Sequence, residues 1–317
     1  MDPFKRNLER ERFPITYEVP SPRGGNIDDY IERIASYDFL DRLVGLNVCN
    51  NPVGKVRIDP APFAGKILRE LNIEPIAHLT CRDTTLSGLQ KWLLGADSLG
   101  IRTLLAMTGD YAVGDYPAEE KIDTINSMEL ITGIKKYLNN GQLMPELSTR
   151  QSRLRNRYMV ELEDLEKPTD FTVGGVLLPR RAGEPNYGAN KIRAGTDFFQ
   201  TQITYDAQEV LILIKELEAL VDRVPPILVS TAPFATHEEM VFLSENVPQV
   251  NIPEKVQNRL SQAKDFAMES VNYAVEMYVK ISDGLKEQGS KTKVGAHIIP
   301  MRSKEMAANI VKEISDL

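Results

Sequence analysis

Short apolar segments rich in β-branched residues alternate along the chain with longer segments whose apolar residues recur at helical spacing. The short segments predict eight strands: Ile15–Val19, Arg42–Val48, Glu74–Thr80, Thr103–Thr108, Phe171–Leu178, Phe198–Tyr205, Pro226–Ser230 and Lys293–Ile299. Helical segments lie between these strands. Eight consecutive units of a strand followed by a helix predict an α/β protein with a (β/α)8 TIM-barrel fold.

The predicted helices carry recognisable end signals. Asn26 predicts an N-cap, Thr84 or Thr85 predicts the start of another helix, and Gly100 predicts the end of that helix. The rival fold is a doubly wound open sheet, but the chain lacks the GxGxxG turn that is typical of its dinucleotide-binding versions. We therefore expect a single barrel domain over residues 1–317.

Two segments are longer than the basic unit requires. Residues 139–170 form an insertion before the fifth strand that mixes Arg and Glu and has helical stretches. It is either a solvated helical extension on the outside of the barrel or a lid or partner-docking element. Residues 253–289 form a long helical region before the last strand, and the spacing of its apolar residues predicts core packing.

Composition narrows the function classes. The chain is 42% hydrophobic and 26% charged with a net charge of −7, which predicts a soluble globular protein and disfavours nucleic acid or an anionic membrane as a partner. Only Cys49 and Cys81 are present, and the histidines have no metal-ligand spacing, so we expect no metal site. The N-terminal segment has no apolar signal region and no segment approaches the ~20 apolar residues of a membrane span, so we expect a cytoplasmic protein.

Polar residues stand at the C-terminal ends of most predicted strands, which is where TIM barrels hold their active sites. Each of them alone is more often a turn, cap or core residue than a ligand contact. A barrel would nevertheless bring all of them to one rim, where two carboxylates on different strands suit acid–base chemistry. These residues are Glu18, Asn47, Asn50, His78, Thr80, Arg82, Asp83, Thr108, Gly109, Asp110, Gln200, Gln202 and His297.

Amides and hydroxyls predominate among these rim residues. Together with Gly109, where we expect the backbone to approach something closely, they favour a flat, hydrogen-bonding heterocycle as the ligand. Lys191 and Arg193 precede the sixth strand, where they would either meet a phosphate or form a solvated helix face. The residues alone leave these two alternatives open.

Several long motifs resemble the methylenetetrahydrofolate reductase family, most closely the reductase half of bacterial fusions with a homocysteine methyltransferase. They are "NVCNNPVGKVRIDP", "EPIAHLTCRDTTLSGLQKWLLGADSLGIRTLLAMTGDYAVGDYP", "AGTDFFQTQITYD" and "IPEKVQNRL". The resemblance runs from about Ile15 to the last strand and is weakest in the insertion. It implies a flavin-binding TIM barrel that reduces 5,10-methylenetetrahydrofolate to 5-methyltetrahydrofolate in one-carbon metabolism and methionine biosynthesis.

The resemblance also implies roles for individual residues. Glu18 matches the catalytic acid that protonates N10 of the folate, and Asp110 matches a second catalytic carboxylate beside the flavin. Gln202 and Phe234 match substrate contacts, with Glu18 also touching the substrate. The flavin-binding positions matched are Asn47, His78, Thr108, Gly109, Asp110, Ser127 and Lys191.

The resemblance implies FAD as the flavin, with FMN as the alternative because Thr108 stands where the best-known branch often has Arg. NADH or NADPH is the implied electron donor, and some relatives instead use a redox partner subunit; we expect a homo-oligomer. An acid at this site needs a raised pKa, which burial of Glu18 would supply. The other readings are a flavin-free folate-dependent methyltransferase or demethylation component, and a non-catalytic folate-binding subunit.

Overall fold

Eight parallel strands close into a barrel in the order β1 to β8, with β8 paired to β1. The structure is a computed structural model that describes residues 2–82, 84–109, 124–145, 164–247, 249–301, 303–315 and 317. The (β/α)8 prediction is therefore confirmed. The strands are β1 (Ile15–Val19), β2 (Gly45–Val48), β3 (Pro75–Thr80), β4 (Thr103–Met107), β5 (Thr172–Leu177), β6 (Phe198–Thr201), β7 (Ile227–Thr231) and β8 (Val294–Ile298).

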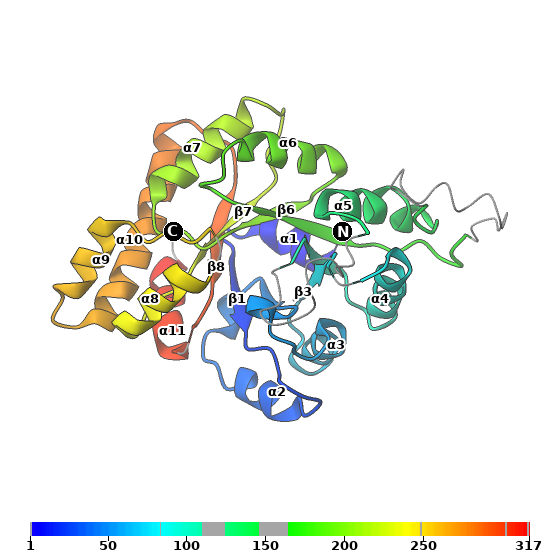
Figure 1. The fold of residues 1–317 in the computed structure, drawn as a ribbon, viewed down its shortest axis with the longest axis horizontal. Coiled ribbons are helices and arrows are strands. Elements are labelled where there is room, and N and C mark those ends of the chain that lie inside the picture. The colour runs from blue at the N-terminus through cyan, green and yellow to red at the C-terminus, as the bar shows by residue number, and fades with distance from the viewer. Residues whose placement is uncertain are drawn as a thin grey trace.

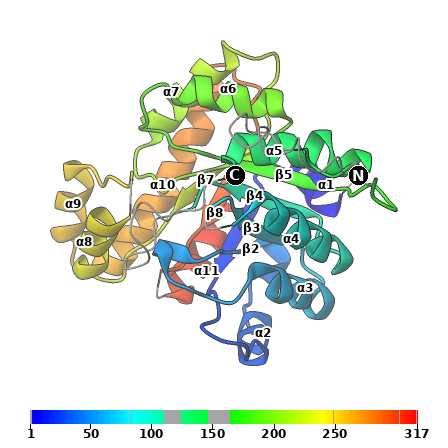
Figure 2. The ribbon, with the colours of Figure 1, turned by 45° about the vertical axis from the view of Figure 1, so that its right-hand side comes forward.

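Helices surround the strands, as Figures 1 and 2 show from two directions. Apolar residues on the outward faces of the strands pack against the apolar stripes of these helices in one large cluster. The α-helices in the described part of the chain are α1 (Pro3–Arg10), α2 (Asp28–Ala35), α3 (Pro60–Leu71), α4 (Leu86–Ser98), α5 (Ser127–Lys136), α6 (Glu184–Ala194), α7 (Ala207–Glu218), α8 (His237–Asn246), α9 (Glu254–Ser261), α10 (Phe266–Glu287) and α11 (Lys304–Ile314).

The end signals of the helices were predicted with mixed success. Thr85 caps α4 by accepting a hydrogen bond from the Gly88 amide, and Gly100 follows that helix with a φ of +82°. The prediction for Asn26 was wrong, because Ile27 occupies the N-cap of α2. The side-chain amide of Asn26 instead donates to the Asp29 carboxylate in the first turn, 3.1 Å away.

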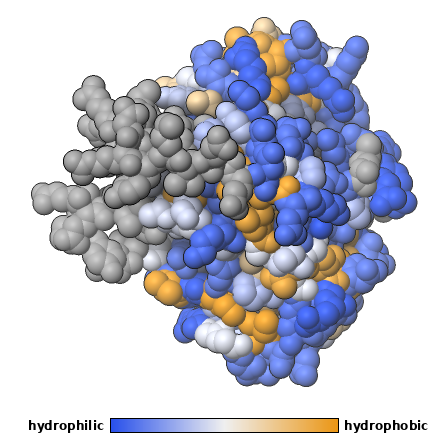
Figure 3. All heavy atoms as spheres, turned by 90° about the vertical axis from the view of Figure 1, so that its right-hand side faces the viewer, coloured by the Kyte–Doolittle hydropathy of each residue, from blue (hydrophilic) through white to orange (hydrophobic). Residues whose placement is uncertain are grey.

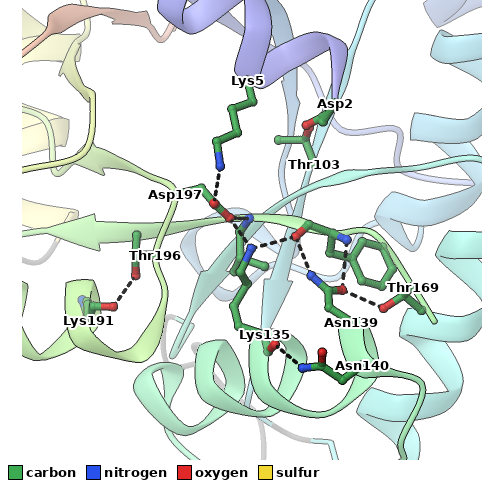
Figure 4. A network of polar contacts seen from close by, with 12 residues as sticks. Asp2, Lys5, Thr103, Lys135, Asn139, Asn140, Thr169, Lys191, Thr196 and Asp197 are labelled. Atoms are coloured by element: carbon green, nitrogen blue, oxygen red, sulfur yellow. Dashed lines mark hydrogen bonds and ion pairs between the residues drawn. The ribbon is translucent and has the colours of Figure 1, made fainter.

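The N-terminal end of the barrel is closed by α1. Phe4 and Leu8 of this helix belong to a buried cluster with residues of several strands, and the ring of Phe4 packs edge-on against Phe198 at 5.0 Å between centroids. Asp197 holds the helix in place, since it accepts from Lys5 of α1 at 2.9 Å and from Lys135 of α5 at 2.8 Å (Figure 4). The barrel interior is thus filled with side chains at this end.

The structure describes both ends of the segment 139–170 and the whole of the segment 253–289. Residues 146–163, the middle of the expected insertion, lie outside the described residues. At its start, Asn139 bonds the backbone of Phe171 just before β5 through both its amide nitrogen and its amide oxygen (Figure 4). In the later segment the prediction of core packing is confirmed, because Val256 and Leu260 of α9 are buried in a second cluster.

The surface seen in Figure 3 is mainly hydrophilic where it is formed by described residues, with apolar side chains in separate groups. No helix among the described residues is both long and apolar enough to cross a membrane. Cys49 and Cys81 are both buried and are not joined in a disulfide.

Candidate active site

A cavity of about 470 Å³ opens at the C-terminal ends of the strands. This volume falls within the ~300–1,000 Å³ that is usual for small-molecule and cofactor sites. Side chains from the rim and from the inside of the barrel meet there, as expected for parallel strands that end on one side. The residues expected at the site that line it are Glu18, Asn50, His78, Thr80, Thr108, Gly109, Ser127, Lys191, Gln200, Gln202 and His297.

Glu18 stands one residue before the end of β1 and is 23% exposed. Its carboxylate Oε2 lies 3.7 Å from Nε2 of His297, on the neighbouring strand β8. Burial by itself raises the pKa of Glu18, but the hydrogen bond and charge of His297, the charge of His78 and a hydrogen bond from Cys49 together lower it below its ordinary value. The expectation that burial gives Glu18 a raised pKa is therefore wrong for the protein without ligand.

A buried polar network lies beneath the cavity. Asn47 of β2 is 0% exposed and contacts three side chains from other strands. Its Oδ1 lies 2.9 Å from Nε2 of His78 and 2.9 Å from Nε2 of Gln200, and its Nδ2 lies 3.1 Å from Nδ1 of His297. Asn47 was expected to bind the cofactor, but it does not line the cavity and instead bonds these three neighbours, which do line it.

His78 is buried in this network at the end of β3, and burial lowers the pKa of its imidazole to about 4. It is therefore neutral near pH 7 and offers the cavity a hydrogen-bonding ring without a charge. Such a group suits the polar edge of a heterocycle better than a phosphate.

The basic side of the cavity lies beside β5 and α6. Lys191 is 9% exposed, donates from Nζ to the Val176 carbonyl at 2.5 Å, and has a pKa lowered to about 8 by burial. Arg181 also lines the cavity and forms an ion pair with Glu184. Arg193, the second cation of the predicted phosphate site, is exposed and bonds Asn190 and the Leu220 carbonyl, so the solvated-face alternative holds for it.

The aromatic residue at the site is Phe242 of α8 rather than Phe234. Phe234 is 0% exposed and its ring stacks on Tyr205 at 5.1 Å, so it cannot meet a substrate in this structure. Phe242 is 44% exposed and lines the cavity. Its sequence signal was weak, since Phe242 is an exposed residue of a helix whose buried face is formed by residues such as Met240 and Leu243.

Position 109 requires a glycine because of its backbone conformation and its close contact with Thr80. Its φ is +99°, and a Cβ at this position would lie 3.0 Å from Cβ of Thr80. The close approach expected from the sequence is therefore to Thr80 of the neighbouring strand. Asp110, the expected second catalytic carboxylate, and Asp83 lie outside the described residues.

Two smaller cavities adjoin the central one. A lateral cavity of about 430 Å³ shares Glu18, Phe242, Ile299 and Met301 with it. Another of about 360 Å³ shares Asn50, Thr80 and Gly109 and is also lined by Arg82. Glu18 is thus accessible from two sides of Phe242, which leaves room for a ligand that is longer than one ring system.

The family model described as methylenetetrahydrofolate reductase matches residues 3–146 and 183–315. The chain belongs to the methylenetetrahydrofolate reductase family. The matched residues include the strands that carry Glu18, His78 and His297 and also Gln202, which directly follows β6, and the unmatched stretch contains β5. Comparison with curated proteins gives no match.

Among solved structures, this member of the methylenetetrahydrofolate reductase family is similar to an uncharacterized protein from Clostridium thermocellum that binds two copies of 5-methyl-5,6,7,8-tetrahydrofolic acid. The TM-score is 0.64 at 16% identity, with 99% of this chain and 98% of the other covered, which supports the shared fold. A putative lyase/mutase from Burkholderia cenocepacia J2315 follows at a TM-score of 0.44 and 12% identity, covering 84% and 96% of the two chains. That similarity is too low to support an argument.

The residues of the cavity fit a flavin. Amide, imidazole and hydroxyl groups of Gln202, His78, Thr108 and Ser127 can meet the polar edge of a flat ring, and Lys191 can meet a phosphate. Among the described residues, no group of three or more His, Cys, Asp or Glu side chains is placed to hold a metal ion.

Proposed function

We propose that the protein binds a flavin and a reduced folate in the barrel mouth and interconverts 5,10-methylenetetrahydrofolate and 5-methyltetrahydrofolate. The observation that carries this proposal is Glu18, a carboxylate that is open to the cavity and backed by His297 inside a family of folate reductases. The Clostridium thermocellum structure supports a folate ligand, because that protein has the same fold and binds a methylated tetrahydrofolate.

The cofactor would lie across the described floor of the cavity. Gln202, His78, Thr108 and Ser127 would bond its ring, and Lys191 would bond its phosphate. FAD is the expected form and FMN the alternative, with NADH, NADPH or a redox partner subunit as the source of electrons. When bound, the flavin supplies the hydride that converts the methylene carbon to a methyl group.

Glu18 would donate the proton that the reaction requires and would accept it in the reverse direction. Reduction requires that the bond between the methylene carbon and N10 breaks, and Glu18 in its acid form donates a proton to N10 as this bond opens to an iminium at N5. The resulting carboxylate is then stabilised by Nε2–H of His297. In the opposite direction the same carboxylate removes the proton from N10 as the ring closes.

The lowered pKa of Glu18 bears directly on this cycle. Without ligand, Glu18 is held as a carboxylate, the form that follows proton donation. A planar ligand over Glu18 removes water from the carboxylate, and this desolvation raises its pKa toward the form that can donate. The acid form is therefore a property of the complex rather than of the empty site.

The half-reactions test the proposal. Purified protein should show a bound-flavin absorption spectrum that NADH or NADPH bleaches under anaerobic conditions and that 5,10-methylenetetrahydrofolate restores. Glu18→Gln should keep flavin binding and bleaching but lose at least ~100-fold in the rate of reoxidation, since a positioned general acid contributes ~10²–10⁴. Glu238→Gln is the matched control, because Glu238 is an exposed carboxylate that lines only the lateral cavity.

The outcomes separate the parts of the proposal. Equal loss of both half-reactions in Glu18→Gln would contradict its role as proton donor. A flavin that bleaches normally but is never reoxidised by the folate would mean that the substrate is wrong. Protein that binds folate and no flavin would favour the methyltransferase or demethylation alternative, and a folate complex with no turnover would favour a binding subunit.

A further inference from the structure

Asn47 connects the floor of the cavity to the Glu18–His297 pair. Gln200 and His78, which both line the cavity, bond its Oδ1, and His297, which faces Glu18, contacts its Nδ2. Asn47 does not line the cavity, although it pairs in register with Glu18 on the neighbouring strand β1. Its hydrogen bonds reach Glu18 through His297, whose Nδ1 contacts Asn47 and whose Nε2 faces Glu18.

The hydrogen bonds of an amide have a fixed polarity, because its oxygen only accepts and its nitrogen only donates. Oδ1 of Asn47 receives the amide nitrogen of Gln200, so Nδ2 is the atom that is left for His297. Because Nδ2 of Asn47 donates to Nδ1 of His297, Nδ1 must accept and therefore carries no proton. In neutral His297 the proton then sits on Nε2, which is the atom that faces Glu18.

Thr16 is the other contact of Nδ1 of His297, with Oγ1 at 3.1 Å. Its hydroxyl can instead donate to the Ala296 carbonyl at 3.3 Å, whereas the Nδ2 of Asn47 has no such freedom within this network. Among the described residues, the titratable groups that face His297 are Glu18 on β1 and His78 on β3, and His78 stays neutral at pH 7 because its pKa is about 4. The amide of Asn47 is therefore the polar group that sets the protonation pattern of His297.

We infer that Asn47 is a positioning residue that fixes the tautomer of His297 with Nε2–H directed at Glu18. Glu18 thereby meets a hydrogen-bond donor, which favours its carboxylate form. Reversal of the Asn47 amide would place Oδ1 against Nδ1 of His297 and would require a proton there. A ligand that changes the hydrogen bond of Gln200 can thus act on Glu18 without touching it, and this consequence rests on the proposed function of Glu18.

The tautomer can be measured directly by NMR of isotopically labelled histidine ring nitrogens. The chain contains only three histidines, His78, His237 and His297, so each ring can be assigned by single substitution. We expect Nδ1 of His297 in the wild-type protein to carry no proton and the ring proton to lie on Nε2. A proton on Nδ1 in the wild-type protein would overturn the inference without any variant.

Asn47→Asp provides the second test, because a carboxylate only accepts. His297 should therefore gain a proton on Nδ1. Asn50→Asp is the matched control: Asn50 lines the cavity and bonds Thr80 at 3.3 Å, so its change should leave the His297 signals unaltered. An unprotonated Nδ1 in Asn47→Asp, or an equal change in both variants, would refute the role of Asn47.

The functional readout is separate. If the folate reaction is as proposed, the pH profile of flavin reoxidation should shift in Asn47→Asp more than in Asn50→Asp, with flavin binding retained. If the wild-type protein shows no folate reaction, the proposed function fails while the NMR result still decides the role of Asn47. If Asn47→Asp does not fold, the wild-type spectrum alone decides.

Discussion

The charge of Lys191 gives the sharpest prediction about the cofactor. Lys191 is 9% exposed, and burial lowers its pKa from 10.5 to about 8, although the charge of Glu184 raises it in part. Lys191 is therefore mostly charged at pH 7 and mostly neutral at pH 9. A phosphate bound beside it would favour the charged form and return the pKa toward its ordinary value.

The size of the effect follows from this difference in pKa. With a pKa of about 8 in the free protein and about 10.5 in the complex, binding takes up a proton at pH 9 but hardly any at pH 7. The affinity for the phosphate should then fall by about tenfold between pH 7 and pH 9, or about 1.4 kcal/mol. The phosphate itself adds little to this change, because its second pKa is about 6.

Titration of FMN and riboflavin by quenching of flavin fluorescence provides the assay. The dissociation constant of FMN should rise about tenfold from pH 7 to pH 9, while that of riboflavin, which has no phosphate, should stay within about twofold. Lys191→Met should remove the pH dependence for FMN, and Arg193→Met should keep it, since Arg193 is exposed and bonds groups outside the cavity. A pH-independent FMN affinity, or an equal change for both flavins, would refute the assignment of Lys191 to the phosphate.

Three further changes test the fold and the substrate side of the site. Burial and the charge of Asp2 raise the pKa of Glu74 to about 7, so the native state holds an extra proton between pH 4.5 and 7 and stability falls as pH rises through this range. Because Glu74 is only partly buried, we expect Glu74→Gln to stabilise the protein by about 1–2 kcal/mol at pH 8 and by much less at pH 5 in urea unfolding; equal effects at both values would contradict this. Gly174→Ala should destabilise by about 1–3 kcal/mol, because the new Cβ would lie 2.4 Å from the buried ring of Phe198, and Phe198→Leu in the same chain should recover part of the loss; additive unfolding energies would show that the clash is not the cause. Phe242→Ala should weaken binding of 5-methyltetrahydrofolate about tenfold in calorimetric titration while leaving FMN affinity and the unfolding free energy nearly unchanged, whereas a parallel loss of FMN binding would place the ring at the flavin instead.

The barrel could be predicted from the sequence because its signals are local. The short, almost continuous apolar stretches of the strands and the helical spacing of the segments between them are properties of neighbouring residues, and β1 was predicted to the residue at Ile15–Val19. Glu18, His78 and Gln202 could be placed at the cavity for the same reason, since all parallel strands of a barrel end on one side.

Only the tertiary structure decided how these residues act on one another. Asn47 and His78 both belong to predicted strand ends, yet one lies beneath the cavity and the other lines it. The direction in which the pKa of Glu18 shifts depends on His297. This residue is far away in the chain and lies next to Glu18 only because β8 closes onto β1. Sequence periodicity reports which face of an element is buried. Electrostatic and hydrogen-bonding effects depend on distances between atoms of different elements, and barrel closure sets those distances.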